Sequence, residues 1–266
     1  MPLLKTLNVR MDVDSIPRDV VTVGLKVVTQ RFESHFHRHR KAQCLMAISG
    51  VMTCEAEGAI RILPPQTAVW IPADVEHRIT FAGHLEGYNA FVDPAAARNL
   101  PTTCSSISVS PLLRELLIRS AHYEIDVEPG GMESRVAALL LEEIAASKIE
   151  SLQLPMPRDA RLRKIFQRLL DHPADPGTIK DWSRRIAMSE RTLARLMVAE
   201  TGMSFGRWRQ QLGIMLALQW MAKGTTIQQV ASDLGYENVG SFVTMFRKAL
   251  GAPPARYMAA LKSSAK

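Results

Sequence analysis

The sequence predicts an α+β protein with two domains, a β-rich N-terminal domain and an all-α C-terminal domain. Its 266 residues exceed the usual length of one domain and are sufficient for two. The hydrophobic period changes along the chain, and so does the charge: residues 1–157 carry a net charge of −3 and residues 158–266 a net charge of +10. We therefore expect one domain over residues 1–150, a linker over 151–157 and a second domain over 158–266.

The N-terminal domain contains two kinds of periodicity. From Val20 to Val92, short β-rich runs such as "VVTVGLKVVTQ" and "CLMAISGVMTCEAEG" are separated by glycine and proline, which predicts a small antiparallel barrel or sandwich. After Pro111, "LLRELLIRSAHYE" and "MESRVAALLLEEIAAS" have apolar residues at helical spacing. We expect two amphipathic helices whose apolar stripes pack within the subunit or across a dimer.

The linker and the cysteines complete this outline. "SLQLPMPR" at residues 151–158 contains two prolines and lies where the charge changes sign. Cys44, Cys54 and Cys104 are an odd number without C-x-x-C spacing, and the N-terminus lacks the apolar core of a signal peptide. No apolar run approaches the length that crosses a membrane. These features predict a reduced, cytoplasmic chain in which Cys44 is a buried apolar residue.

Two segments of the basic half repeat one pattern. "TIKDWSRRIAMSERTLARLMVAETG" begins at Thr178 and "TIQQVASDLGYENVGSFVTMFRKALG" begins at Thr226. Each is typical of a helix-turn-helix, in which Ser189 or Asn238 caps the second helix and a glycine ends it. The apolar segment "SFGRWRQQLGIMLALQWMAKG" predicts a long connecting helix. Such a helix can hold two recognition helices roughly 34 Å apart, the spacing of successive major grooves.

The predicted surface of the two recognition helices differs between the copies. A buried stripe of Leu193, Leu196 and Met197 leaves Arg191 and Arg195 on the opposite face, where arginine can pair with guanine or touch phosphate only. The second copy offers little hydrogen bonding, so we expect thymine-methyl and phosphate contacts there. The predicted DNA contacts are Ser189, Arg191, Thr192, Ala194, Arg195, Asn238, Val239, Gly240, Ser241, Val243 and Thr244.

Three stretches carry a resemblance to a known family. "MSERTLARLM", "ETGMSFGRWRQQL" and "IQQVASDLGYENVGSFVTMFRKALGAPPARY" resemble the DNA-binding domain of the AraC/XylS transcription regulators over residues 158–257. Met197, Gly213 and "NVGS" at residues 238–241 depart from the usual pattern. The resemblance implies a nucleoid-associated activator or repressor that binds double-stranded promoter DNA, RNA polymerase and a small-molecule effector as a homodimer.

A histidine motif lies in the acidic half. His37, His39 and Gln43, with Gly50 further on, resemble the first cupin motif with glutamine in place of glutamate, and "WIPADVEHRI", with His77, resembles the second. A cupin-like β-barrel is the usual N-terminal sensor in this family. We expect His37, His39, Gln43 and His77 to line an effector pocket or to hold a divalent metal; no cofactor is certain, and His35 lies outside the group.

Three functions compete. The leading prediction is an effector-controlled regulator, and the "HRHRKAQ" and "WIPADVEH" segments resemble a subgroup that often controls neighbouring transporter or efflux genes. A metal-dependent cupin enzyme would use His37, His39 and His77, but Gln43 weakens it and it leaves the repeat unexplained, so we expect no enzyme. A ligand-independent architectural DNA binder is the third.

Overall fold

The computed structural model describes residues 12–63, 67–123, 130–150 and 153–263. The chain divides into two compact units, which are described separately below. Among the described residues, the β unit comprises 12–57, 61–63, 67–123 and 130–150, and the helical unit comprises 58–60 and 153–263. The predicted fold class is confirmed, with a β-rich N-terminal part that carries two helices and an all-α C-terminal part. The predicted linker includes residues 151 and 152, outside the described residues, and the short strand β9 (Gln153–Pro155).

The β unit is built around a curved sheet in which one long strand is central. β6 (His77–Val92) pairs antiparallel with β1 along one edge and with β2 and then β3 along the other. β2 also pairs with β5, β5 with β7 and β7 with β8, and each of these pairs is antiparallel. The other strands are β1 (Val20–Glu33), β2 (Ala42–Ser49), β3 (Met52–Ala56), β4 (Ala59–Leu63), β5 (Thr67–Ile71), β7 (Ser105–Ser108) and β8 (Ile149–Glu150).

The strand boundaries do not follow every glycine and proline of the β-rich region. β5 ends at Ile71 and β6 begins at His77, but β6 then continues through Gly87 to Val92 without a break. A Cβ at Gly87 would lie 2.5 Å from the Met46 carbonyl oxygen of the neighbouring strand. This glycine therefore permits a close approach of β2 and β6 and does not mark a turn.

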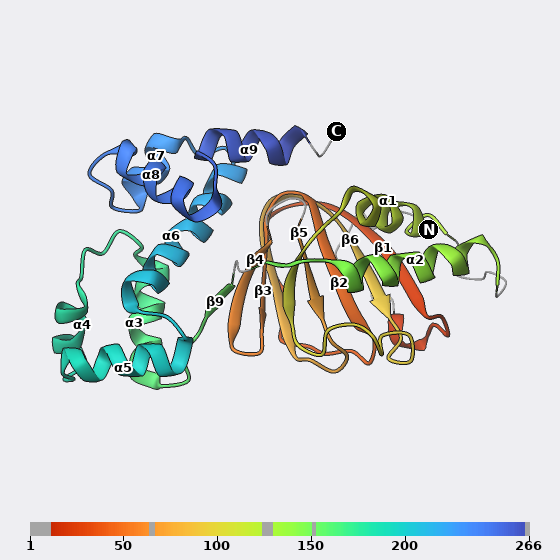
Figure 1. Cartoon of the computed structure of the whole chain (residues 1–266), viewed down its shortest axis with the longest axis horizontal. Helices are drawn as coiled ribbons and strands as arrows, with labels where there is room; N and C mark the ends of the chain where they lie inside the picture. Colours follow the sequence, from red (N-terminus) through yellow and green to blue (C-terminus); the bar gives the residue numbers. More distant parts are fainter. Residues whose placement is uncertain (1–11, 64–66, 124–129, 151–152, 264–266) are drawn as a thin grey trace. The chain divides into compact units, whose positions relative to one another are not determined.

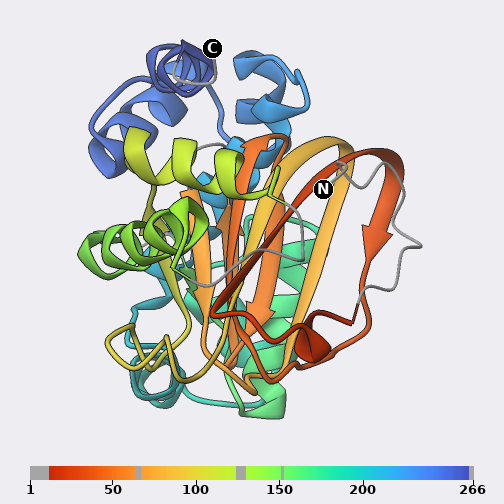
Figure 2. The same ribbon diagram turned by 90° about the vertical axis from the view of Figure 1, so that its right-hand side faces the viewer.

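The two faces of the sheet bury different clusters. Helices α1 (Pro111–Ser120) and α2 (Met132–Ala146) lie together on one face, as Figure 1 and Figure 2 show. Their buried leucines pack with Cys44 and Met46 of β2. Leu45 and Ala47 of the same strand point to the opposite face and join a second cluster. The apolar stripes of both helices thus find a partner surface inside the subunit.

The cysteines behave as apolar core residues. Cys44, Cys54 and Cys104 are free and buried. Burial raises the pKa of the Cys44 thiol to about 12, so this side chain stays protonated at neutral pH. The prediction of Cys44 as a buried apolar residue is confirmed.

The helical unit contains seven helices among the described residues, and α6 is its central helix. Trp208 of α6 stacks on Phe166 of α3, with ring centroids 3.7 Å apart, and donates its indole N–H to the carbonyl oxygen of Pro155. No helix in the described parts of the chain is long and apolar enough to cross a membrane. The helices are α3 (Ala160–Asp171), α4 (Ile179–Arg185), α5 (Glu190–Thr201), α6 (Phe205–Ala222), α7 (Ile227–Asp233), α8 (Val239–Leu250) and α9 (Pro254–Ser263).

Candidate nucleic-acid interface and histidine cluster

The first helix-turn-helix consists of α4 and α5, and local hydrogen bonds define its ends. Thr178 and Asp181 form a reciprocal capping box at the start of α4. Ser189 Oγ accepts from the backbone N–H of Thr192 at 3.2 Å and begins α5. Gly202, with φ of 69°, ends α5 in the left-handed conformation that glycine adopts without strain. The predicted caps of this helix are confirmed.

The surface of α5 follows the predicted division into two faces. Leu193 and Met197 are fully buried and Leu196 is half-buried. Arg191 and Arg195 are exposed on the other face and, among the described residues, make no ion pair with an acidic side chain. Two guanidinium groups on one helix face, one turn apart, are therefore available to an external partner. The other predicted contacts on this helix, which are also exposed, are Ser189, Thr192 and Ala194.

The second helix-turn-helix, α7 and α8, repeats this plan. Thr226 caps α7, and Asn238 Oδ1 accepts from the backbone N–H of Ser241 at 2.8 Å to begin α8. Gly251, with φ of 78°, ends α8. Both predicted caps of α8 are confirmed, and its core residues Phe242 and Phe246 are fully buried.

The exposed face of α8 has a different chemistry from that of α5. Gly240, Ser241 and Thr244 are exposed, as is the cap Asn238. Val239 and Val243, two of the predicted contacts, are half-buried and pack against the cluster around the buried phenylalanines.

Sequence reasoning omitted two cations of the last turn of α8. Arg247 and Lys248 are exposed and, within the described residues, have no acidic partner. When the two repeats are aligned on their helix-ending glycines, Gly202 and Gly251, Arg247 falls at the position of Val198, which is exposed three residues after Arg195. This alignment was the available signal. An open hollow of about 920 Å³ lies beside Lys248, between α6 and the start of α8, and is lined by Gly206, Gly213, Asn238, Ser241, Thr244 and Lys248 among others.

One loop ties both helix-turn-helix units to α6. The Arg209 guanidinium of α6 donates to the carbonyl oxygens of Asp175 and Gly177. Trp182 of α4 donates its indole N–H to the same Gly177 oxygen at 3.1 Å. A Cβ at Gly235, where φ is 80°, would lie 3.1 Å from the Ala174 carbonyl oxygen, so the turn of the second unit closes on this loop only with glycine. These contacts hold the two recognition helices in a defined relation within the helical unit.

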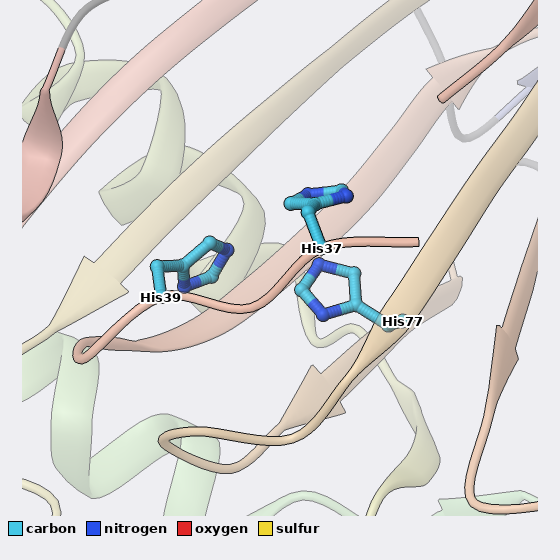
Figure 3. A group of neighbouring side chains, drawn as sticks. All are labelled: His37, His39 and His77. Atoms are coloured by element: carbon cyan, nitrogen blue, oxygen red, sulfur yellow. The ribbon is translucent and has the colours of Figure 1, made fainter. Parts of the chain in front are cut away.

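Three histidines meet in the β unit, as Figure 3 shows. His37 and His39 lie on the segment before β2, and His77 begins β6. The centroid of the His77 ring lies 4.4 Å from that of the His37 ring and 5.0 Å from that of the His39 ring. One ligand atom from each ring lies within 4.8 Å of the other two. The structure therefore brings together three of the four residues predicted for the effector or metal site.

The burial of the three rings differs. His37 is exposed, His39 is half-buried and His77 is fully buried. Burial lowers the pKa of His77 to about 4, so this imidazole is neutral at physiological pH. The cluster thus has one side open to solvent and one side inside the unit.

Gln43 occupies the fourth predicted position on β2, which is buried. Its Nε2 donates to Asn89 Oδ1 at 2.8 Å, and its Oε1 is buried without a hydrogen-bond partner among the described residues. Gln43 shares a face with Leu45, so its side chain belongs to the interior face of the sheet. A second unpaired acceptor therefore lies in the same unit as the histidines.

Comparison with known proteins gives consistent results. The model of a family described as a helix-turn-helix domain matches residues 182–260. The HTH-type transcriptional regulator NimR of Escherichia coli K12 is 40% identical over 233 residues, which cover 88% of this chain and 85% of that protein. The arabinose operon regulatory protein of the same organism is 28% identical over 134 residues, 49% of this chain and 46% of that protein.

A solved structure of ToxT from Vibrio cholerae O395, bound to (E)-4-(8-methylnaphthalen-1-yl)but-3-enoic acid, aligns with 92% of this chain and 100% of that chain. Its sequence identity is 11% and its TM-score 0.39. The family assignment depends instead on the helix-turn-helix match and on the near full-length match to NimR. The chain belongs to the AraC/XylS family of DNA-binding transcriptional regulators.

Proposed function

We propose that the chain is a one-component regulator whose helical unit reads an operator and whose β unit binds a small-molecule effector. The observation that carries the first part is the pair of exposed arginines on α5, Arg191 and Arg195, which have no acidic partner among the described residues. Arginine donates two hydrogen bonds to guanine O6 and N7, worth about 1–3 kcal/mol of discrimination per base pair. We assign direct base readout to these two side chains.

The second recognition helix has a supporting role in this proposal. Gly240, Ser241 and Thr244 offer short side chains that suit thymine methyl groups and phosphates, and the half-buried Val239 and Val243 supply at most apolar contact. Arg247 and Lys248 add positive charge at the end of the helix, where phosphates can pass. The predicted set of contacts is thereby extended by two phosphate-binding residues.

The effector proposal concerns His37, His39, Gln43 and His77. Unpaired buried acceptors on His77 and Gln43 support a polar ligand site in the β unit. A buried acceptor that lacks its hydrogen bond costs about 1–3 kcal/mol, and a ligand that donates to it removes this cost. Exposed Leu112, Met132 and Leu139 on α1 and α2 support a homodimer interface.

The setting in which the protein acts is proposed from its family. We propose a cytoplasmic, nucleoid-associated protein that contacts RNA polymerase at the promoters of neighbouring genes, such as transporter or efflux genes. We assign no catalytic activity to the histidine cluster. The proposed domains remain residues 1–150 and 158–266, joined by the linker 151–157.

Footprinting of the full-length protein on the DNA upstream of its own and neighbouring genes tests the operator proposal. Two recognition helices on one face of B-DNA should protect two segments about 10 base pairs apart, centre to centre. Protection without a defined position would contradict sequence-specific readout. Arg191→Ala should weaken one of the two protected segments more than the other.

A thermal-shift screen separates a sensor from an architectural DNA binder. A compound that binds only the folded state raises its stability by RT ln(1 + [L]/Kd), about 2.7 kcal/mol at a hundredfold excess over Kd. A compound that shifts the wild-type melting temperature and not that of Gln43→Ala supports the pocket. If no compound from a broad polar library moves the wild-type transition, the effector proposal fails and the DNA proposal stands.

A further inference from the structure

Two of the three buried cysteines form a pair inside the β unit. Cys54 belongs to β3, and Cys104 is the last residue of the irregular segment between β6 and β7. Their thiols share a hydrogen bond, and both side chains belong to the cluster on the face of the sheet opposite to α1 and α2. Cys44 packs in the other cluster. The structure therefore brings Cys54 and Cys104 together and leaves Cys44 apart.

The hydrogen bond makes the two thiols unequal. The S–H of Cys54 donates to the sulfur of Cys104, which raises the pKa of Cys54 and lowers the pKa of Cys104. Burial raises the pKa of Cys54 further. The thiolate is the nucleophilic form of cysteine, so Cys104 is the sulfur that reacts first and Cys54 the one that follows.

A buried guanidinium accompanies the pair. Arg61 of β4 is 4% exposed and donates to the carbonyl oxygens of Ala56, at 2.9 Å, and Cys104, at 2.8 Å. Its Nε has no hydrogen-bond partner among the described residues, and no carboxylate described by the structure forms an ion pair with it. Its positive charge favours the thiolate at both cysteines. A buried cation without a counter-ion is destabilising, and a thiolate at Cys104 supplies the missing negative charge.

The backbone allows one sulfur to move toward the other. Cys54 is fixed in β3, where it pairs with Ile79 of β6. The Cys104 N–H donates to the Glu57 carboxylate at 2.9 Å, and its carbonyl oxygen accepts from Arg61. Both backbone groups of Cys104 are thus bonded to side chains and not to a strand ladder. A small shift of this residue can shorten the contact of the sulfurs to the S–S bond length of about 2.0 Å.

We propose that Cys54 and Cys104 are a thiol-oxidation site at which a peroxide produces an intramolecular disulfide. The Cys104 thiolate attacks one peroxide oxygen, the O–O bond breaks, and Cys104 becomes a sulfenic acid. The hydroxide that leaves takes up the proton released earlier by Cys104. The sulfur of Cys54 then bonds to that of Cys104, and the sulfenic hydroxyl leaves with the Cys54 proton as water. Two thiols and one hydrogen peroxide give one disulfide and two waters.

The disulfide would cross-link strands that are distant in the sheet. β3 and β7 are separated in strand order by β6, β2 and β5, so a bond from Cys54 to Cys104 closes the curved sheet across its interior face. In a reducing cytoplasm such a bond is transient and is reversed by dithiol reductants. As an input to promoter binding the site depends on the regulator function proposed above, whereas the oxidation itself does not.

Oxidation is tested on the reduced, full-length protein treated with hydrogen peroxide and digested without reductant. Peptide mass spectrometry should find one Cys54–Cys104 disulfide per chain, which dithiothreitol removes. Cys54→Ala should stop at a sulfenic acid on Cys104, trapped with dimedone, and Cys104→Ala should lose thiol at least about 10-fold more slowly. Cys44→Ala is the matched control, a buried cysteine outside the pair, and should form the disulfide at the wild-type rate. The wild-type assay requires no variant, so a variant that does not fold leaves it decisive.

Three results would overturn the oxidation site: no disulfide in the wild-type protein, a disulfide that involves Cys44 at similar yield, or linkage between chains only. Promoter affinity of the reduced and oxidised samples is measured in parallel and should differ by about 5-fold or more in the wild type and not in Cys54→Ala. An unchanged affinity refutes the regulatory role. Promoter binding without a disulfide refutes the site and leaves the regulator intact. A disulfide without promoter binding in either state refutes the operator readout and leaves the site.

Discussion

The two helix-turn-helix units of this protein share a backbone plan and differ in the surface that they present. Both begin with a threonine cap, open the second helix with a side-chain cap and end it with a left-handed glycine. On the exposed face, α5 presents Arg191 and Arg195, whereas α8 presents Gly240 and Thr244 at the equivalent positions. The residues that cap and end the helices therefore correspond between the two units, whereas the residues that would read bases differ.

This difference supports the proposal that the two units contribute unequally to DNA recognition. Long cations with forked donors discriminate guanine, whereas glycine and threonine do not. The loop at residues 173–177 joins both units to α6, so that a contact made by one places the other. We infer that the first unit specifies the sequence and the second sets the register on the DNA.

The largest loss of stability is expected from a substitution in the core of the second helix-turn-helix unit. Phe246→Ala removes a fully buried ring that contacts Phe242 and Tyr257 and should lower the free energy of unfolding by about 3–5 kcal/mol. Urea denaturation followed by tryptophan fluorescence measures this. Val198→Ala on the exposed face of α5 is the control and should change stability by less than about 0.5 kcal/mol. Similar losses in both variants would contradict the described core.

The difference between the faces is tested by removing one arginine. Arg195→Ala should lose about 1–3 kcal/mol of discrimination at one base pair and little at the others. Arg195→Lys keeps the charge without the fork and should lose the same discrimination. Lys248→Ala, by contrast, should weaken binding to all sequences equally and reduce the salt dependence by about one phosphate contact. Fluorescence anisotropy with operator variants at several salt concentrations makes these comparisons.

The caps should be equivalent in the two units. Ser189→Ala and Asn238→Ala each remove a side-chain acceptor for the N–H at the third helical position, and each should cost about 1 kcal/mol. Chemical denaturation of the two variants under identical conditions gives the comparison. Ser189→Asp, which retains an acceptor, should restore most of the loss; a cap variant with wild-type stability would indicate that the helix end does not depend on it.

The smallest expected difference between the units depends on pH. In α4, the Thr178 hydroxyl and backbone N–H both donate to Asp181, which lowers the pKa of that carboxyl, whereas α7 has Gln229 at the same position, and its Nε2 donates to Asp233. A depressed pKa gives stability that is present above the unfolded value of about 3.8 and is lost as pH falls through the folded value.

Below about pH 4, fraying should therefore begin at α4 and not at the start of α7. Amide NMR signals of Thr178 and Thr226 across an acid titration measure this. Asp181→Gln should remove the difference between the units, because neither cap then titrates. Simultaneous loss of both signals in the wild-type protein would count against the contrast.

Much of this arrangement could be predicted from local sequence patterns. The caps at Ser189 and Asn238 and the glycines that end both helices follow from short-range chemistry, and the structure contains all of them. The resemblance of the segments around His37, His39 and His77 to the two cupin motifs implied that these side chains converge, and the structure brings them together. These features depend on residues close in sequence or on a recognisable motif.

Other features depend on contacts between distant segments. Gly87 resembles a turn signal in the sequence, but it permits the approach of β2 to β6. Val239 and Val243 were assigned to the DNA-facing surface, and the structure shows in addition that both are half-buried and pack against the phenylalanine cluster, a contact that helical spacing alone does not give.

The proposal that the two recognition helices contribute unequally to sequence readout is tested most directly with a set of single base-pair variants of the operator. Once footprinting has located the two half-sites, every base pair in each is replaced singly, and the affinity of the wild-type protein is measured. The largest penalties, about 1–3 kcal/mol per base pair, should fall in the half-site contacted by α5, with smaller penalties in the other. Equal penalties in both half-sites, or larger penalties opposite α8, would contradict the account.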